Sequence, residues 1–448
     1  MIKNLLITAM LLMPYALRAS DCPLKFYSDS VSSVGIVVYD LQEEREVFNC
    51  NGAKSLIPAS TMKLVTSAAA LSLYPYDYQY ETPAYIYGII KDGTLYGDLI
   101  IKGSGDPTLY SRHFPDNQTF IEDIVSSLKG MGVKRIAGNM SVDLGDTANQ
   151  GKLGTWEIED GYYEYGTGWY SFNHRDNVFW YNPTTYETRP SSAIFDEMVN
   201  TVDGKLYLNQ SFGASYNEID DTEEFSEDTS LKLPNPRPND LFISELCECM
   251  ADSSIVFIYD EEIDNQEMEM DTDSIPVASY YSPALKAILK DLMSRSDNMM
   301  AESTLRLLAP GKSIKEALKV EKEFYESKGI STDMYTIKDG SGLSRSNGIS
   351  PAFLVQVLKM MSKNEDFIDI FPRAGMDGTL KNTFKGSVLE GRAALKSGSM
   401  GAVRCYAGYL LDDDDNPRYA VAVMVNNFKC KLPELHKQIE LFLSKYYE

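Results

Sequence analysis

The stretch Ser60-Thr61-Met62-Lys63 opens a run of small and apolar residues that continues almost to Pro75. Because Pro58 marks a turn just before it, the pattern predicts a buried helix that starts here and stops before Pro75. Residues three apart on a helix share a face, so the amine of Lys63 can reach the hydroxyl of Ser60. Apolar surroundings lower the pKa of a buried lysine, and a neutral lysine can activate a serine as a nucleophile.

The same spacing recurs at Ser126-Ser127-Leu128-Lys129, at the end of a polar helical stretch before Gly130. A serine and a lysine three residues apart occur often on solvated helices, so the S-x-x-K pattern alone is a weak signal. We interpret this second copy as the exposed end of a surface helix. Two further elements of the sequence favour the first copy as the functional one.

The first of these elements is Ser296-Asp297-Asn298, which lies between two amphipathic helical stretches and is predicted to form a short turn. A hydroxyl and a carboxamide in such a turn can relay a proton and hold both Lys63 and a substrate carbonyl. The S-x-N pattern also occurs at Ser171-Phe172-Asn173 and at Ser215-Tyr216-Asn217, which we attribute to chance. The serine and the asparagine of the first stretch are therefore the candidate catalytic residues.

The second element is Lys396-Ser397-Gly398-Ser399, which occurs once, just before an apolar strand predicted over residues 402–411. On an edge strand the glycine would let a substrate backbone approach closely, and the lysine with the serine beside it suits a free carboxylate. The backbone N–H groups of Ser60 and Ser399 are natural donors to an oxyanion. The sequence therefore predicts that this stretch binds substrate.

The composition excludes several classes of protein. With 44% hydrophobic and 24% charged residues the chain is globular, and its 448 residues suffice for roughly three domains, or for one core with large insertions. The formal net charge of -23 repels phosphate backbones, so we expect no nucleic-acid partner. The chain has only three histidines, His113, His174 and His436, and they lie far apart in the sequence. This argues against a Ser-His-Asp triad and against a metal site built from histidines. We expect neither a metal ion nor a cofactor.

The pattern of apolar residues changes twice along the chain. Near the start, residues 34–40 and 46–50 are apolar runs joined by a polar turn, which predicts a hairpin. From Thr82 to about Val277 the sequence is rich in tyrosine, glycine and aspartate, which is typical of short strands and turns. Helical periodicity then returns, and the chain closes with two strands and a helix. The middle of the chain is therefore interpreted as an insertion between two segments of one domain.

Taken together and in this order, the three motifs are far more specific than any one of them. The set resembles the serine D-Ala-D-Ala carboxypeptidases, and specifically the class C low-molecular-mass penicillin-binding proteins, which also act as endopeptidases and carry a large insertion between their first two motifs. The resemblance is weakest from about 178 to 230, and Ser397 stands where threonine is commoner. Further stretches similar to this family are Gly103-Ser104-Gly105-Asp106-Pro107-Thr108-Leu109, Gly132-Val133-Lys134-Arg135-Ile136, Leu233-Pro234-Asn235-Pro236, Asp339-Gly340-Ser341-Gly342-Leu343-Ser344-Arg345 and Asp377-Gly378-Thr379-Leu380.

The resemblance implies an α/β (α+β) fold of the serine β-lactamase and transpeptidase type, in which an antiparallel sheet lies between helical layers. It implies a catalytic domain built from residues 21–81 and 277–448. An inserted, mostly β module would fill residues 82–276, with room for two subdomains.

The resemblance also implies a function and a role for each motif residue. Ser60 would attack the carbonyl of the penultimate D-alanine of a peptidoglycan stem peptide, with Lys63 as the base, to form an acyl-enzyme. Ser296 would return the proton to the leaving amine, and Asn298 would orient the lysine and the acyl chain. The substrate-binding stretch Lys396-Ser397-Gly398-Ser399 would hold the terminal carboxylate, or the acidic centre beside a cross-link. β-Lactam antibiotics would be inhibitors.

Three alternatives remain open from the sequence. A β-lactamase shares the motif set, but the closest match to its Glu-x-x-Leu-Asn loop is Glu302-Ser303-Thr304-Leu305-Arg306, which lacks the asparagine. A non-catalytic penicillin-binding sensor would keep the fold, although every motif side chain is intact. A glycosidase with a pair of carboxylates is conceivable in any acidic exported chain, but no acid pair stands out.

The first twenty residues are typical of an export signal, with Lys3, a short apolar run and Leu17-Arg18-Ala19 near a cleavage site. The apolar run is too short to span a bilayer, and no later segment is apolar enough. We therefore expect a signal peptide over residues 1–20 and a soluble mature protein without a transmembrane anchor, in the periplasm or otherwise outside the cytoplasmic membrane. Cys22 with Cys50 is the one plausible disulfide, and most of the six cysteines are expected to be buried free thiols.

Overall fold

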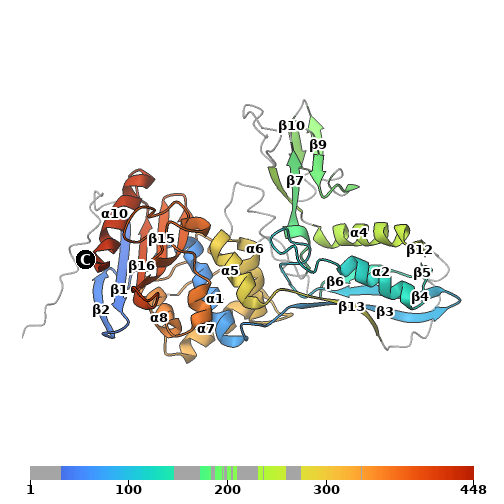
Figure 1. The fold of residues 1–448 in the computed structure, drawn as a ribbon, viewed down its shortest axis with the longest axis horizontal. Coiled ribbons are helices and arrows are strands. Elements are labelled where there is room, and N and C mark those ends of the chain that lie inside the picture. Colours follow the sequence, from blue (N-terminus) through green and yellow to red (C-terminus); the bar gives the residue numbers. More distant parts are fainter. Residues whose placement is uncertain are drawn as a thin grey trace, which may run out of the picture.

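The structure is a computed structural model of the chain, and it forms an elongated molecule with two parts (Figure 1). One part contains both the first strands and the last helix of the described chain, and the other contains the middle of the sequence. The residues that the structure describes are 32–145, 172–182, 187–193, 195, 199–202, 205–208, 231–235, 237–258, 274–333 and 335–447. The predicted signal peptide and Cys22 lie outside these residues.

The first part is built on a five-stranded antiparallel sheet with the order β14-β15-β16-β1-β2. Its strands are β1 (Ser33–Asp40), β2 (Arg45–Cys50), β14 (Ala393–Met400), β15 (Val403–Leu411) and β16 (Pro417–Asn426). The predicted hairpin near the start and the two strands near the end are confirmed. Because β1 pairs with β16, the two ends of the chain share one sheet, and β14 lies at its edge.

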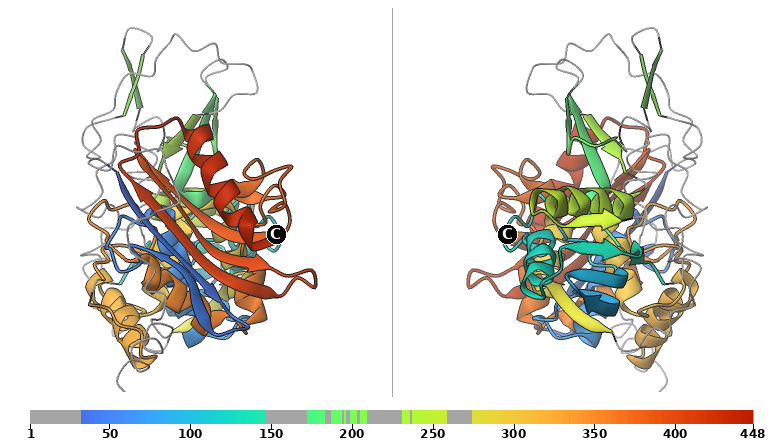
Figure 2. Two further views of the ribbon diagram at one scale, coloured as in Figure 1. Left: turned by 90° about the vertical axis from the view of Figure 1, so that its left-hand side faces the viewer. Right: turned by 90° about the vertical axis from the view of Figure 1, so that its right-hand side faces the viewer.

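Alternating side chains of this sheet pack into two separate cores. In β1, Ile36 and Val38 belong to the core under the C-terminal helix, whereas Val37 belongs to the core on the opposite face. Successive side chains of a strand point to opposite faces, so a strand that is apolar throughout is covered on both sides. Helix α10 (Leu432–Ser444) covers one face, as the left view of Figure 2 shows. An antiparallel sheet between helical layers is therefore confirmed.

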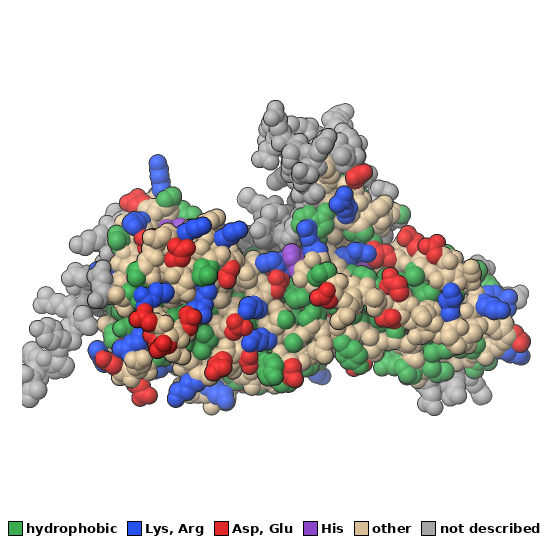
Figure 3. Space-filling model, in the orientation of Figure 1, with side chains coloured by type: hydrophobic (Ala, Val, Ile, Leu, Met, Phe, Trp, Pro, Cys, Tyr) green, Lys and Arg blue, Asp and Glu red, His purple; other side chains and the backbone are tan. Residues whose placement is uncertain are grey.

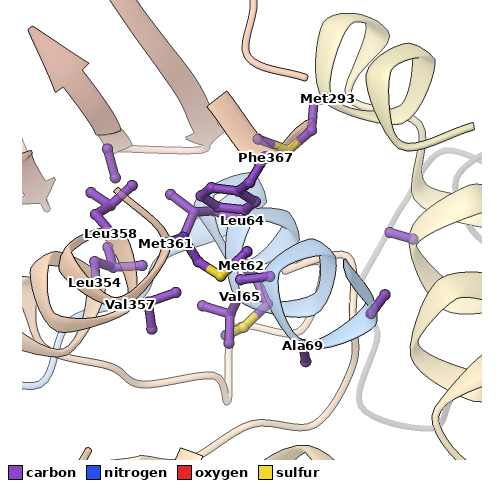
Figure 4. Packing of buried hydrophobic residues seen from close by; sticks show 14 of the residues in the cluster. Met62, Leu64, Val65, Ala69, Met293, Leu354, Val357, Leu358, Met361 and Phe367 are labelled. Carbon is purple, nitrogen blue, oxygen red and sulfur yellow. The ribbon is translucent and has the colours of Figure 1, made fainter. Parts of the chain in front are cut away.

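The helices of the other face surround α1 (Met62–Leu73), which is the buried helix predicted after Pro58. Its side chains are buried from Met62 to Leu71, and Figure 4 shows Leu64 and Val65 among the side chains of neighbouring helices, including Met361 and Phe367. The neighbours are α5 (Leu285–Arg295), α6 (Asn298–Leu307), α7 (Ile314–Ser327), α8 (Pro351–Met361) and α9 (Glu365–Asp369). The helix that carries the candidate base is thus enclosed by these helices.

The second part contains a mixed sheet with the order β12-β5-β4-β3-β13, and β6 also pairs with β4. Helices α2 (Phe120–Gly130) and α4 (Pro238–Asp252) pack on it, as the right view of Figure 2 shows. Its strands are β3 (Glu81–Lys91), β4 (Thr94–Lys102), β5 (Arg135–Ala137), β6 (Met140–Asp143), β12 (Val256–Ile258) and β13 (Ile275–Tyr281). We propose that β3 and β13, which pair with each other, connect the inserted module to the catalytic domain.

Two small sheets complete the second part. One contains β7 (Val178–Asn182), β8 (Glu187–Arg189) and β11 (Leu231–Pro234), and the other contains β9 (Val199–Val202) and β10 (Lys205–Leu208). They lie within or beside the segment in which the family resemblance is weakest. Across the described residues, no helix has the length and apolarity needed to cross a membrane.

The cysteines differ in part from the expectation. Cys405 is a buried free thiol, but Cys247, Cys249 and Cys430 are only half-buried. The first two lie on α4, where the amphipathic pattern exposes part of the helix surface. The pairing of Cys22 with Cys50 stays a prediction.

Candidate active site

The candidate nucleophile lies at the start of α1, a helix that is buried over most of its length. Ser60 belongs to a short 3-10 turn (Ala59–Thr61) that leads directly into α1, and its side chain is half-buried. The hydroxyl of Thr61 donates to the carbonyl of Pro58 at 2.7 Å and so closes this turn. Ala59 has a φ of 47°, a left-handed conformation that costs energy for a residue with a Cβ and that is typical of functional sites.

The amine of Lys63 has three polar neighbours. It donates to the side-chain oxygen of Asn298 at 2.6 Å and to the carbonyl of Ser341 at 2.7 Å, and it lies 3.0 Å from the hydroxyl of Ser60. The first two neighbours can only accept, whereas a serine hydroxyl can also donate. A neutral amine has two N–H bonds and one lone pair, so its lone pair would face Ser60. This arrangement suits a base that removes the proton of the serine.

The electrostatics favour this neutral form. Lys63 is fully buried, and burial lowers its pKa from 10.5 to about 8 because the charged form loses its hydration. The nearby carboxylates of Glu302, Asp297 and Asp339 act in the opposite direction and limit the decrease. At pH 7 about one Lys63 in ten is therefore deprotonated, a far larger share than for an exposed lysine.

The predicted turn between two helices is present and joins both lysines of the site. Ser296 ends α5 in a left-handed conformation, with a φ of 61°, and Asp297 caps α6 by accepting from the backbone N–H of Met300 at 2.9 Å. This cap fixes Asn298 as the first residue of α6, with its carboxamide on Lys63. The turn therefore presents the serine and the asparagine side by side.

The edge strand β14 supplies the second lysine. The amine of Lys396 is fully buried and donates to the hydroxyl of Ser296 and to the carbonyl of Ser397, both at 2.9 Å. Burial, followed by repulsion from Lys63, lowers the pKa of Lys396 well below its usual value. The hydroxyl of Ser397 lies 2.8 Å from that of Thr379. Two hydroxyls and an amine thus line the strand beside the nucleophile.

The glycine of this strand is needed for a close approach of two backbones. A Cβ at Gly398 would lie 2.7 Å from the carbonyl oxygen of Pro58 and 3.1 Å from the backbone nitrogen of Ser60. Only glycine allows β14 to lie this close to the turn that carries the nucleophile. The backbone N–H groups predicted to stabilise an oxyanion, those of Ser60 and Ser399, therefore come from two chain segments in contact.

The structure adds a loop that the sequence did not assign to the site. The carbonyl of Ser341 receives a hydrogen bond from Lys63, and the backbone N–H groups of Gly340 and Ser341 donate to Glu302 at 3.2 and 2.8 Å. Asp339 holds the same loop by accepting from the N–H of Gly342 and from that of Ser344, at 2.8 and 2.6 Å. The buried carboxylates thus position a backbone carbonyl on the base.

The sequence around these residues resembles stretches of the family, but this similarity did not indicate a chemical role for them. The loop and the segment around Thr379 are both similar to family stretches, yet a backbone carbonyl leaves no mark in a sequence. The sequence relates Glu302 only to the Glu-x-x-Leu-Asn loop of the β-lactamases. In the structure it lies inside α6, and burial together with repulsion from Asp339 raises its pKa to about 7.

The remaining candidate patterns lie elsewhere. Ser126 and Lys129 are exposed on α2, in the second part of the molecule, as predicted for a surface helix end. Ser171 and Ser215, which begin the two chance S-x-N patterns, lie outside the described residues. Within the described part of the chain, no group of three histidine, cysteine or acidic side chains could hold a metal ion.

Comparisons with known proteins identify the family of this chain. A model of the D-Ala-D-Ala carboxypeptidase 3 (S13) family matches residues 28–224 and 239–446. D-alanyl-D-alanine carboxypeptidase DacB of Haemophilus influenzae is 25% identical over 408 residues, which covers 85% of this chain and 82% of that protein. Penicillin-sensitive carboxypeptidase A of Dictyostelium discoideum is 23% identical over 447 residues, covering 90% of this chain and 85% of that protein.

A solved structure shares the fold. Penicillin binding protein 4 (dacB) from Haemophilus influenzae superposes with a TM-score of 0.73 at 22% identity, covering 96% of this chain and all of that one. The same protein in complex with a β-lactam superposes with a TM-score of 0.68 at 21% identity, covering 93% of this chain and 96% of that one. The expected fold class is confirmed over nearly the whole chain.

Proposed function

Because this chain belongs to the D-Ala-D-Ala carboxypeptidase 3 (S13) family, it is a serine D-Ala-D-Ala carboxypeptidase that acts on peptidoglycan, and we propose that Ser60 is its nucleophile. One observation carries the proposal. The amine of Lys63 is buried, lies 3.0 Å from the hydroxyl of Ser60, and is held by two groups that only accept hydrogen bonds.

The proposed reaction uses each motif in turn. Lys63 takes the proton of Ser60 as the serine oxygen bonds to the carbonyl carbon of the penultimate D-alanine. The oxyanion accepts hydrogen bonds from the backbone N–H groups of Ser60 and Ser399. The peptide C–N bond then breaks, and a proton passes through Ser296 to the leaving amine. Water later splits the acyl-enzyme and releases the shortened peptide.

The proposed route of that proton follows the contacts of Ser296. Its hydroxyl accepts a hydrogen bond from Lys396, so its own hydrogen is free to point into the cleft. Burial, followed by repulsion from Lys63, lowers the pKa of Lys396 and so disfavours a second positive charge beside the base. Asn298 holds Lys63 in place throughout.

We further propose that the enzyme cleaves cross-links and that β-lactams acylate it. Lys396, Ser397 and Thr379 can hold any carboxylate beside the scissile bond, whether it ends the chain or belongs to the acidic centre next to a cross-link. A β-lactam carries a carboxylate next to its reactive carbonyl and fits the same arrangement. Incubation with cross-linked muropeptides, followed by separation of the products, measures the balance of the two cleavage activities.

A β-lactamase is the less favoured function. Both carboxylate oxygens of Glu302 already accept from backbone N–H groups of the loop beside Lys63, at 3.2 and 2.8 Å. A carboxylate engaged in this way is poorly placed to activate a water for rapid deacylation. We therefore expect a stable penicillin adduct, which a fluorescent penicillin labels on a gel, and prompt hydrolysis of the same adduct would favour the β-lactamase.

Export is part of the proposal. Peptidoglycan lies outside the cytoplasmic membrane, so we propose that residues 1–20 are a signal peptide and that the mature enzyme acts in the periplasm or otherwise outside that membrane. Fractionation of cells that make the full chain tests this directly.

The pKa of Lys63 sets the expected pH dependence of acylation. A protonated lysine cannot accept the serine proton, so the efficiency of acylation, kcat/KM, rises with pH and levels off above the pKa of about 8. Two pH units below that value, Lys63 is deprotonated in only about one enzyme molecule in a hundred. Stopped-flow acylation by a chromogenic penicillin between pH 5.5 and 9 measures this limb, and a flat profile would contradict a lysine base.

The carboxylate site gives a second prediction. Charge-assisted hydrogen bonds of this kind contribute about 1.5–3 kcal/mol, so amidation of the terminal carboxylate of a D-Ala-D-Ala peptide lowers acylation efficiency by roughly one to two powers of ten. The Ser397→Ala variant loses less from amidation, because part of the contact is already absent. Acylation of both peptides by both proteins forms a double-mutant cycle. Equal losses in the two proteins would show that Ser397 does not read the carboxylate.

A further inference from the structure

A cavity of about 430 Å³ lies outside the catalytic motifs, at the base of β7. Three arginines contribute to its lining, together with two aromatic rings and one carboxylate. Figure 3 shows Lys and Arg side chains gathered in this region of the surface. The lining residues are Tyr110, Arg112, Arg175, Asp176, Val178, Trp180, Arg189 and Pro190. Three guanidinium groups around one cavity are unexpected in a chain with a formal net charge of -23.

Within the described part of the chain, two of these arginines form no ion pair with an acidic side chain. Arg175 is neutralised by Glu245, which accepts from its guanidinium at 2.8 and 3.1 Å. Among the described residues no carboxylate forms an ion pair with Arg112 or Arg189, and both side chains are exposed. Unpaired guanidinium groups at the wall of a cavity are typical of sites that bind carboxylates or phosphates.

Trp180 brings the two free arginines together. The guanidinium carbon of Arg112 lies 4.2 Å from the centre of the Trp180 ring, and Arg189 is directly opposite Trp180 in the pairing of β7 with β8. Opposite residues of neighbouring strands lie on the same face with their Cβ atoms about 5 Å apart. The ring therefore holds one guanidinium flat against it and places the second beside it, which reduces the entropy that each loses on binding.

The chain segment that lines the cavity also contacts the helix that begins at Asn298. Residues Arg175, Asp176 and Asn177 all have positive φ values of 53° to 57°, and the amide of Asn177 donates to the sulfur of Met299 at 3.3 Å. Met299 follows Asn298, which holds the base. A buried contact thus connects the segment that lines the cavity with the helix that carries Asn298.

The side chain of Asp176 favours a carboxylate over a phosphate as the ligand of this cavity. Its Oδ1 is buried without a hydrogen-bond partner in the described part of the chain, and burial raises its pKa. His113, Arg295 and Asp297 are the nearby charged or titratable groups. A carboxylate between the two arginines can share a proton with Asp176, whereas the larger charge of a phosphate would be repelled by it.

We propose that this cavity binds a carboxylate of the peptidoglycan peptide remote from the scissile bond, between Arg112 and Arg189. The proposal rests on the proposed function, because it takes the ligand from the substrate held at Ser60. Stem peptides carry carboxylates on their acidic residues in addition to the terminal one, so a recognition site for a second carboxylate would select long peptides over D-Ala-D-Ala alone.

The test compares two muropeptides that share a free terminal D-alanine carboxylate. One keeps its remote carboxylates, and in the other these are amidated. For the first, the double variant Arg112→Gln/Arg189→Gln raises KM roughly tenfold, since two partly exposed charge-assisted contacts are lost. For the amidated muropeptide the same variant changes KM by less than twofold, because that contact is already absent.

The control has the same loss of charge elsewhere on the module. Lys91→Gln/Lys134→Gln alters two exposed lysines at the β3–β4 end of the sheet and leaves the preference for free carboxylates intact. The thermal unfolding midpoint shows that each variant is folded. Three results would overturn the proposal. The arginine variant could change KM equally for the two muropeptides, or it could change KM for neither. Inorganic phosphate at matched ionic strength could also compete as strongly as a carboxylate. Absence of penicillin labelling in the unaltered enzyme would instead refute the proposed function.

Discussion

Replacement of Ser60 by alanine abolishes both covalent penicillin labelling and cleavage of D-Ala-D-Ala peptides. The substitution removes the oxygen that we propose forms the acyl bond, and among the described residues no other hydroxyl forms a hydrogen bond with Lys63. Loss of a nucleophile of this kind lowers turnover by at least about a thousandfold. The change removes a single oxygen from a half-buried side chain, so the fold is retained. Gel labelling with fluorescent penicillin and chromatographic assay of released D-alanine measure the two losses.

The second S-x-x-K copy supplies the control for this experiment. Ser126→Ala makes the same chemical change on the exposed surface of α2, and activity stays within about twofold of the unaltered enzyme. Covalent labelling that survives in Ser60→Ala would show that another residue is the nucleophile.

The second large effect concerns the base. Lys63→Arg is expected to be nearly as inactive as Lys63→Ala, with acylation lowered by about 10²–10⁴-fold, the usual contribution of a general base. An arginine keeps the positive charge but cannot be deprotonated in a protein, so it cannot accept the serine proton. It must also fit a guanidinium among Ser60, Asn298 and the Ser341 carbonyl, a space that holds a single amine.

The comparison of the two variants separates charge from basicity. Stopped-flow measurements give the rate of penicillin acylation for each variant, and thermal unfolding shows whether each variant is folded. If Lys63→Arg kept substantial acylation while Lys63→Ala did not, the lysine would act as an electrostatic anchor and another group would take the proton.

Sequence patterns predicted the elements that carry the motifs. The apolar run after Pro58 is α1, the alternating runs near both ends of the chain are strands of one sheet, and Ser296-Asp297-Asn298 is a turn between helices. These predictions succeed because periodicity, proline and capping residues act locally. The pairing of Ser60 with Lys63 is local as well, since the two lie three residues apart on consecutive helical turns.

The partners of the base could not be predicted in the same way. The carbonyl of Ser341 lies 278 residues from Lys63 along the chain, and any residue type offers such a carbonyl. Thr379 and Glu302 lie in stretches that resemble known families, but the sequence does not show that they contact the motif residues, because only the fold brings them to the site. The cavity at the base of β7 could not be predicted from the sequence either, because Arg112 and Arg189 become neighbours only around Trp180.

The local sequence patterns were enough to predict the elements on which the proposed catalytic side chains lie. The tertiary structure decided their chemical state. Lys63 is an ordinary lysine until α5, α6 and the loop around Ser341 exclude water from its amine, and Lys396 loses its hydration only in the packed sheet. A pKa depends on desolvation and on charges brought near by distant segments, and both of these exist only once the chain has folded.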